Sequence, residues 1–502
     1  GYDPNSLTTK PLVFPEGSTQ IDNAEFKQYS KSFTEDRFLS VYMTGSYTYN
    51  NRYTFFGSLR YDGSNMFGVD RKYKYLPLWA VSGAWNINRE AFLSDADWLS
   101  DLKLRASYGV QGNVDKDTSP LVVGEWDNTQ VLPDNSESNI IVSSPPNQYL
   151  RWEKTTNWNG GLDVAVLGNR IAFTADVYRR VSDDLIGMRS LPGENGFDYS
   201  TMNWAKLTNR GYELSLSTVN VKTKDFRWVM DFNLAHNKSK INRLNVRDNS
   251  YEPSREGYSV GAVFSLKTAG LDENGLQMFY NKQGEKVSFN DFFGLEYGYM
   301  MGGLIPFLKS NLSAEEYRNL FTYEGTTEPK FTGGWINRFY YKNFDLTVSA
   351  SFVLDQTVQE QPFYNPVQTS PGQNYSRRMS QIWSPDNTSG KYPRIMGTYT
   401  EGEENWAYQW LGMLDPGNSY RKYDYWFKKM SYMRINSIRL GYTFPERLLG
   451  HIGFSSARIS FEARNPFVFG SSYKGYFDPE TYGNIYTQPL AKTFSCGIDL
   501  TF

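Results

Sequence analysis

Apolar and polar residues alternate strictly along much of the chain, in stretches of about ten residues that end at Gly, Pro or Asn. Residues 344–354 show this pattern most clearly. Their even positions are apolar, whereas Asp345, Thr347, Ser349 and Ser351 are polar. A period of two over this length predicts a β-strand with one apolar face and one polar face.

The same alternation recurs from one end of the chain to the other. It is clear at 102–110, 226–234, 457–463 and 493–502. Weaker versions begin near Val41, Tyr53, Trp79, Leu162, Ile171, Tyr212, Val263, Phe331 and Ile438. Together these segments predict an all-β fold with about fourteen strands, to within about two.

The predicted strands are joined by two kinds of connection. Some are tight breaks, such as Asn50-Asn51 and Gly168-Asn169, and the others are long polar stretches at 112–150, 180–205, 270–328 and 356–424. Short turns on one side and long loops on the other are typical of outer-membrane β-barrels, whose long loops face outward. Residues 1–36 are expected to form an irregular polar segment, as an extracellular loop. Within 270–328, Ser313-Ala-Glu-Glu316 matches a capping box and predicts a helix.

A soluble β protein with its apolar face inward is the alternative to a membrane barrel. The ten steps from Phe344 to Leu354 span ~33 Å, which a tilt of ~40° reduces to ~25 Å, the height of a transmembrane apolar band. Side chains fill the interior of a barrel only up to about eight strands. We therefore expect a transmembrane antiparallel barrel with a polar, wet interior. The predicted lipid-facing residues are Phe344, Leu346, Val348, Ala350 and Phe352.

Composition narrows the function classes further. The formal net charge is −2, from 52 Lys plus Arg and 54 Asp plus Glu, so nothing indicates a nucleic-acid partner. Mean hydropathy is −0.57 and no run of eighteen apolar residues occurs, which excludes a helical membrane span in this sequence. Cys496 is the only cysteine, so an intrachain disulfide is impossible.

The last strand ends on an aromatic residue. Phe494, Ile498, Leu500 and Phe502 lie on one face, and the polar residues alternate with them. A C-terminal aromatic on an alternating strand resembles the signal by which outer-membrane barrels are recognised for insertion.

Several segments resemble the SusC/RagA family of TonB-dependent transporters of Bacteroidetes. They are residues 37–68, 85–93, 102–113, 433–445, 463–469 and 478–480, and they match in order and spacing over nearly the whole chain. The resemblance implies a barrel of about twenty-two strands with a plugged lumen. This chain, from about residue 37 to 502, would then be the C-terminal portion of that barrel.

The resemblance also implies a function and partners. Such transporters import oligosaccharides or peptides across the outer membrane of a Gram-negative bacterium, together with a SusD-like surface lipoprotein and with energy from TonB. We expect the plug, the TonB-contacting segment and about eight further strands to lie upstream of Gly1. They would belong to a longer chain or to a complementary N-terminal polypeptide of a split or cleaved transporter. A dimer of transporter–lipoprotein pairs is expected as well.

Enzyme chemistry has little support in the sequence. The two histidines, His236 and His451, are far apart, and no catalytic, metal-binding or cofactor motif stands out. Trp406, Tyr408 and Trp410 alternate within a long loop and are candidate substrate contacts, although packing against a partner or neighbouring loops explains them as well. A passive pore or secretion channel is the alternative function, followed by a soluble glycan-binding β protein.

Overall fold

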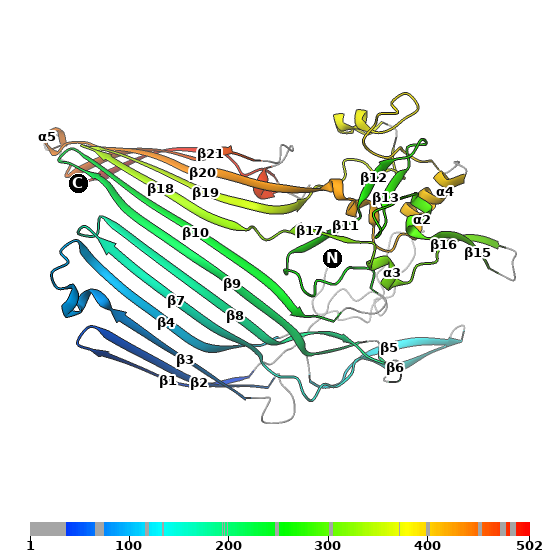
Figure 1. Cartoon of the computed structure of the whole chain (residues 1–502), viewed down its shortest axis with the longest axis horizontal. Coiled ribbons are helices and arrows are strands. Elements are labelled where there is room, and N and C mark those ends of the chain that lie inside the picture. Colours follow the sequence, from blue (N-terminus) through cyan, green and yellow to red (C-terminus); the bar gives the residue numbers. More distant parts are fainter. Residues whose placement is uncertain are drawn as a thin grey trace, which may run out of the picture.

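The computed structural model describes residues 37–65, 75–115, 120–132, 135–192, 194, 196–197, 199–245, 250–300, 305–370, 372–397, 402–449, 454–471, 478–481 and 488–502. The segment predicted as an irregular loop at 1–36 lies outside these residues. Figure 1 shows a single broad, curved and strongly twisted sheet with smaller elements gathered at one end of its strands.

The main sheet has thirteen antiparallel strands, and their order in space follows their order in the chain. The strands are β1 (Phe38–Tyr49), β2 (Tyr53–Ser64), β3 (Tyr75–Asn86), β4 (Leu99–Asn113), β7 (Glu153–Val166), β8 (Ile171–Ser190), β9 (Tyr199–Lys222), β10 (Phe226–Arg243), β18 (Phe331–Tyr341), β19 (Phe344–Gln359), β20 (Phe427–Thr443), β21 (Ser456–Phe469) and β22 (Thr493–Thr501). Among the described residues no strand pairs with the outer edge of β1 or β22, so this sheet is an open wall with two free edges.

Thirteen strands agree with the prediction of about fourteen, and the difference has a clear origin. The strand expected near Val263 forms as β11 (Ala262–Ser265), but β11 pairs with β17 (Thr322–Thr326) in a separate two-stranded sheet. Four residues reach only ~13 Å, too short to continue the wall.

Short connections meet at one end of the strands, which we call the turn end. Asn50 and Asn51, with φ of 48° and 54°, make the tight β1–β2 turn, as Asn does in type I′ hairpins. Between β3 and β4, the short helices η1 (Ile87–Arg89) and η2 (Ala91–Leu93) flank Glu90. Its carboxylate accepts hydrogen bonds from the Tyr53 hydroxyl at 2.5 Å and the Trp85 indole at 2.9 Å. The short helix α5 (Glu446–Leu449) and the C-terminus lie at this same end (Figure 1).

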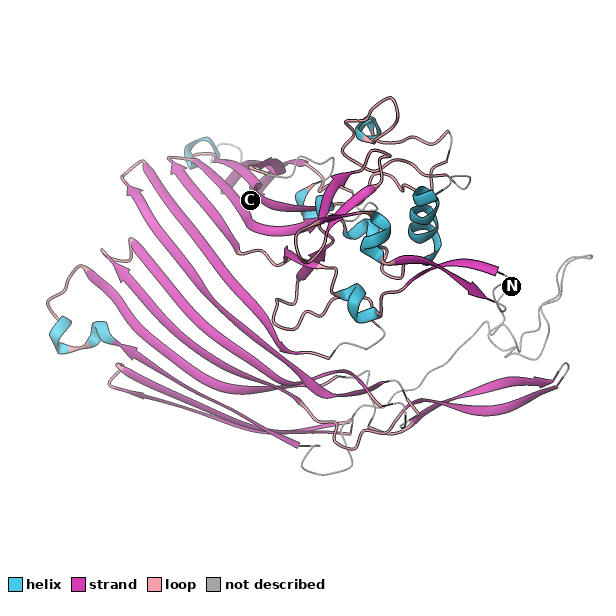
Figure 2. Cartoon of the chain, turned by 45° about the vertical axis from the view of Figure 1, so that its right-hand side comes forward, coloured by secondary structure: helices cyan, strands magenta, loops and turns pink. Residues whose placement is uncertain are grey.

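Long connections meet at the opposite end, the loop end. The β4–β7 connection contains a hairpin of β5 (Val123–Leu132) and β6 (Asn135–Ser144), which projects away from the wall (Figure 2). The sequence predicts a further loop at 180–205, but this prediction is wrong for most of the range. The strands β8 and β9 continue through it, pairing from Leu185–Ala205 to Ser190–Tyr199. Apolar alternation fades there although pairing persists, so the sequence pattern does not reveal the strands.

Two of the predicted loops, 270–328 and 356–424, contribute to a compact unit at the loop end, here called the cap (residues 250–330 and 360–426). Its first part has β12 (Thr268–Leu271), β13 (Gln277–Tyr280), β14 (Lys286–Val287), α2 (Phe289–Phe293), β15 (Leu295–Met300), β16 (Ile305–Ser310) and α3 (Ala314–Arg318) besides β11 and β17. Its second part has η5 (Arg377–Gln381), α4 (Gly402–Gln409), η6 (Trp410–Leu414), η7 (Ser419–Lys422) and η8 (Asp424–Trp426). In Figure 2 the cap stands over the ends of β10 and β18–β20.

An aromatic core holds the two parts of the cap together. Phe279, Phe293 and Tyr317 from the first part pack against Trp410 and Tyr423 from the second, and all five are almost completely buried. The predicted helix is confirmed as α3, with both hydrogen bonds of the Ser313–Glu316 capping box present. No helix in the described part of the chain is long and apolar enough to cross a membrane.

Candidate functional site: the polar face of the sheet

Strand register brings the polar positions of the main sheet onto one face. Directly opposite residues in antiparallel strands share a face. Arg105 of β4 opposes Gly161 of β7, which opposes Asp176 of β8, which in turn opposes Glu213 of β9. On the far side of the wall, Ser349 of β19 opposes Ser437 of β20, and Ser437 opposes Arg464 of β21. The polar face is therefore continuous across strands far apart in sequence.

The opposite face is apolar along the same strands. Leu346 opposes Leu440, and Leu440 opposes Phe461 on β21. The five residues predicted to face lipid all lie on this face, although Ala350 is only 4% exposed because neighbouring side chains cover it. From β22, Phe494, Ile498 and Leu500 continue the same face. The register thus places both sets of predicted residues together, and their contact with lipid remains a prediction.

Charged side chains on the polar face are paired across strands. Arg105 donates to Asp163 at 2.7 Å and to Asp176 at 3.1 Å. On the other side of the wall, Arg458 of β21 binds both carboxylate oxygens of Asp345 at 2.6 and 2.8 Å. Bidentate pairs of this kind fix both side chains in place. The polar face is thus a fixed array of charges, half-exposed to solvent.

Glycines in the middle strands make these pairs possible. A Cβ atom at Gly161 would lie 2.6 Å from Cζ of Arg105 and 2.7 Å from a carboxylate oxygen of Asp176, so the guanidinium occupies the space above that glycine. Gly441 of β20 leaves the same space for the pair between Arg458 and Asp345. In each case the polar side chain reaches across one strand to the next strand but one.

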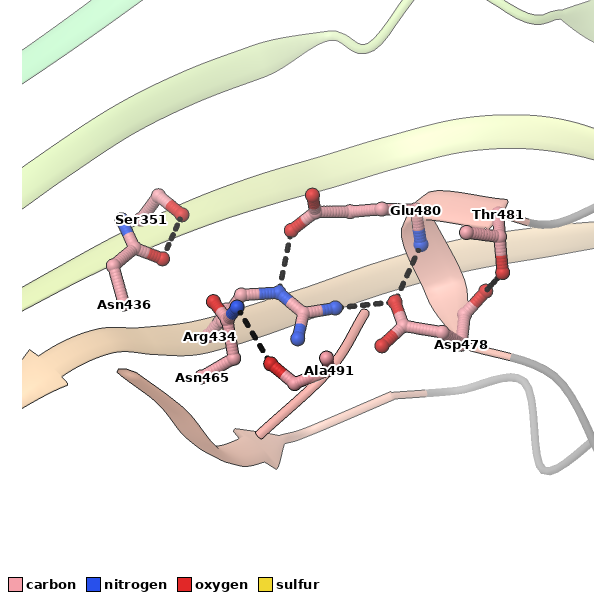
Figure 3. Close-up of polar contacts among 8 residues, drawn as sticks. All are labelled: Ser351, Arg434, Asn436, Asn465, Asp478, Glu480, Thr481 and Ala491. Carbon is pink, nitrogen blue, oxygen red and sulfur yellow. Dashed lines mark hydrogen bonds and ion pairs between the residues drawn. The ribbon is translucent and has the colours of Figure 1, made fainter. Parts of the chain in front are cut away.

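A buried arginine ties a loop to the polar face at its loop end (Figure 3). Arg434 of β20 has a side chain only 3% exposed, and it donates to Glu480 at 2.5 Å and also to Asp478. Both acids belong to the β21–β22 connection, around η9 (Pro479–Thr481). A guanidinium so deeply buried needs such partners, since an unpaired buried charge is strongly destabilising.

Sequence reasoning identified 433–445 and 478–480 as separate motifs and missed that they meet. A signal was present, because an Arg within a strand favours an acidic partner, and Asp478-Pro-Glu480 offers two carboxylates. Arg434 and Asp478 are 44 positions apart, and the sequence between them carries no pattern that fixes the contact.

The polar face is hollowed where β1–β4 approach the loop end. This hollow has a volume of about 660 Å³, and its polar lining includes Ser40, Arg60, Asp62, Gln111 and Asn113. Arg60 donates to Asp62 at 2.6 Å, and the Asp62 side chain is 8% exposed. The lining comes from four strands, so no single sequence motif marks it.

The aromatic residues predicted as substrate contacts lie in the cap. The segment is helical, so Trp406 and Tyr408 are separated by ~200° around α4 and do not form the single stripe that a strand would give. Trp410 is 3% exposed and packs 5.4 Å from Phe293, ring centre to ring centre, inside the cap core. Trp406 is half-buried against Tyr297 at 4.9 Å. Only Trp406 and Tyr408 therefore retain a surface that a ligand could touch.

The histidines show no catalytic arrangement. His236 lies between the rings of Tyr212 and Phe331, and its Nδ1 is 2.6 Å from the Lys330 carbonyl oxygen. His451 lies outside the described residues. Among the residues that are described, no group of three or more His, Cys, Asp or Glu side chains is placed to hold a metal ion.

Comparison with known proteins links this architecture to one family. A family model described as TonB dependent receptor-like, beta-barrel, matches residues 2–300. The chain is 28% identical to TonB-dependent receptor P3 of Formosa agariphila, covering 95% of this chain and 46% of that protein. It is also 28% identical to TonB-dependent receptor SusC of Bacteroides thetaiotaomicron, covering 96% of this chain and 45% of SusC.

A solved structure shares the fold. The RagAB peptide transporter structure superposes with a TM-score of 0.71 at 23% identity, covering 93% of this chain and 48% of the matched chain. The chain thus spans about half the length of the relatives it matches.

Proposed function

This chain belongs to the TonB dependent receptor-like β-barrel family, and on that basis we propose that it forms the barrel portion of a SusC-like nutrient importer. The family is one of transporters and receptors in the outer membrane of Gram-negative bacteria, and this chain is an outer-membrane protein of that kind. The family is not an enzyme family, and we propose no catalytic step and no cofactor for this chain.

The continuous polar face is the observation that carries this proposal. With the apolar face in lipid, the ion pairs of Arg105 and Arg458 line a water-filled interior and no charge is buried in the bilayer. The tight turns then face the periplasm, while the cap and the hairpin β5–β6 face outward. Phe502, at the turn end, closes the strand that we propose as the insertion signal.

The two free edges require further strands. An unpaired edge exposes backbone N–H and C=O groups, which lipid cannot satisfy. We propose that β1 and β22 pair with the remaining strands of the barrel, supplied with the plug by the rest of a longer chain or by a complementary N-terminal polypeptide. TonB would act through that plug.

Outside the barrel, we propose that a SusD-like lipoprotein covers the loop end, in a dimer of transporter–lipoprotein pairs. Oligosaccharides or peptides are the proposed cargo; RagAB, whose matched chain shares this fold, is named a peptide transporter. The hollow around Arg60 and Asp62, together with Trp406 and Tyr408 in the cap, offers the polar and aromatic surface that such cargo needs.

Uptake by intact cells tests the proposal. A strain lacking the transporter gene should fail to take up one class of labelled oligosaccharide or peptide, and the full-length gene should restore uptake. Restored uptake should stop when TonB is deleted. Uptake or ion conductance that persists without TonB would indicate the passive channel instead.

A further inference from the structure

A row of three cations crosses the apolar side of the wall at its loop end. Arg179 of β8 lies directly opposite Arg210 of β9, and Arg210 lies directly opposite Lys238 of β10. All three side chains are exposed. They belong to the same face as the apolar residues of these strands, since Phe232, Leu234 and Lys238 are two or four positions apart on β10.

The row begins where the apolar band ends. Moving toward the loop end, Leu214 of β9 and Leu234 of β10 are followed by Tyr212 and His236, and then by the cations. The ten steps from Trp228 to Lys238 span ~34 Å, or ~26 Å at a tilt of ~40°, which equals the height of a transmembrane apolar band. The cations therefore stand at headgroup level, just beyond the side chains of Tyr212 and His236.

More cations follow on the same face beyond the row. Arg243 lies over the Trp204 ring, with its guanidinium carbon 4.6 Å from the ring centre. Lys206 pairs with Asp183 at 2.7 Å. We call the set the basic patch; it consists of Arg179, Lys206, Arg210, Lys238, Lys240 and Arg243.

The cationic row lacks internal compensation. Within the part of the chain that the structure describes, no carboxylate pairs with Arg179, Arg210 or Lys238. Like charges directly opposite on neighbouring strands are only about 5 Å apart at Cβ and destabilise the sheet. Three exposed cations in one row, with no carboxylate partner among the described residues, favour an anion from outside.

We propose that the basic patch binds the phosphate groups of the anionic glycolipid that forms the outer leaflet of the outer membrane. Arg presents a planar fork that matches phosphate oxygens, and basic residues at headgroup level bind anionic lipid headgroups. The apolar side chains directly beneath the patch supply the surface for the acyl chains. β8–β10 lie in the middle of the wall (Figure 1), so strands added at β1 or β22 would not cover the patch.

This inference rests on the proposed membrane orientation, but it adds a specific lipid site to it. The test uses the full-length transporter in detergent or nanodiscs and a triple variant, R179Q/R210Q/K238Q. The matched control is K222Q/K224Q/R227Q, which removes three positive charges from the other end of the same β9–β10 hairpin. Purified lipopolysaccharide and its chemically dephosphorylated form are titrated onto each protein, with native mass spectrometry as the readout.

The wild type and the control should bind lipopolysaccharide equally, and dephosphorylation should weaken that binding. A basic residue near an anionic surface contributes roughly fivefold to affinity, so the triple variant should bind about 100-fold more weakly. Equal binding by the triple variant, or equal loss in the control, would overturn the proposal. So would a change in oligomeric state with unchanged glycolipid binding, because the patch would then be a contact between copies.

Cargo uptake separates this proposal from the proposed function. The triple variant should still import cargo, since the patch lies on the outer face and leaves the lumen unchanged. If the triple variant takes up cargo as well as the wild type but no longer binds the glycolipid, the result supports the lipid site and leaves the proposed importer function intact.

Discussion

Gly161 and Gly441 act through the space above them more than through their backbone. Neither has a positive φ, so any residue could adopt their conformation. A side chain at either position would fill the space through which an arginine reaches an aspartate two strands away. This explains why small residues stand in the middle of long strands, where glycine otherwise weakens pairing.

Replacement of Gly161 by Ala tests this role. The new methyl group would meet Arg105 at 2.6 Å and Asp176 at 2.7 Å, forcing the ion pairs apart. We expect a loss of roughly 1–3 kcal/mol in the free energy of unfolding, as for overpacked sites. Urea titration of the full transporter, followed by its heat-modifiable gel mobility, measures the loss.

Gly57→Ala is the matched control, because no atom lies within 4 Å of a Cβ built at Gly57. Similar destabilisation in both variants would mean that strand glycines matter here for reasons other than the crossing arginine.

At the level of single contacts, the sequence predicts which positions of a strand are polar, but it predicts few of the ion pairs that these residues form. The alternation at 102–110 and 457–463 is enough to assign Arg105 and Arg458 to the polar positions of their strands. It could not identify Asp176 or Asp345 as their partners, because a pair across an intervening strand depends on register. Register is set by turn geometry and bulges that leave little trace in composition.

The two faces of β19 give the sharpest prediction at the scale of one element. Val348 opposes Ile438 on the apolar face, whereas Ser349 opposes Ser437 on the polar face, and their hydroxyl oxygens are 2.7 Å apart. With the apolar face in lipid, Val348→Arg should cost ~2–4 kcal/mol because the residue lies near the middle of the apolar band. Ser349→Arg should cost no more than the hydrogen bond it breaks, about 1 kcal/mol.

Unfolding of both variants from lipid vesicles would compare these costs directly. Equal tolerance at the two positions would contradict a lipid-facing apolar side.

The cap is the element whose stability should depend most on alkaline pH. Burial raises the pKa of the phenols of Tyr317, Tyr364 and Tyr423 above their ordinary value of 10.0, and for Tyr317 the neighbouring Asp415 adds to the effect. Below pH 10 these phenols are neutral in the folded and the unfolded state, so their ionisation does not lower the free energy of unfolding. Above pH 10 the unfolded phenols ionise first, and the free energy of unfolding falls as pH rises.

Hydrogen exchange between pH 8 and 11, corrected for intrinsic rates, should therefore show loss of protection in the cap while the main sheet keeps its protection. If the cap keeps its protection at pH 11, or if the main sheet loses protection together with the cap, ionisation of these phenols does not control the stability of the cap.

Whole elements differ in how far the sequence reveals them. The wall strands were predictable because one apolar face and one polar face impose a period of two on each strand. Beyond the apolar band neither face needs to be apolar, so the alternation disappears. This is why the sequence does not reveal that β8 and β9 continue through 180–205. The cap core was not predictable, since Phe279 and Trp426 lie 147 residues apart in short irregular elements without a period.

At the scale of the whole molecule, the free edges of β1 and β22 predict dependence on the rest of the barrel. Expressed alone with an export signal, residues 1–502 should not give a heat-modifiable, protease-resistant species in the outer membrane, because two unpaired edges are costly in lipid. The full-length gene, or coexpression of the missing strands with the plug, should give one.

Gel mobility with and without heating distinguishes these cases. A closed, heat-modifiable barrel from residues 1–502 alone would show that β1 and β22 can pair with each other.

The sequential order of the strands also bears on how the wall is assembled. Each strand of the main sheet pairs only with its neighbours along the chain, so the wall can grow by adding one hairpin after another. Even the longest insertions should slow the pairing of the next strand only slightly, because closing a loop costs only about 0.6 kcal/mol more for each doubling of its length. The cap is different, since its core needs both long insertions. Its aromatic core can form only when the insertion between β10 and β18 meets the insertion between β19 and β20. Formation of the cap therefore depends on these strands having come together beneath it.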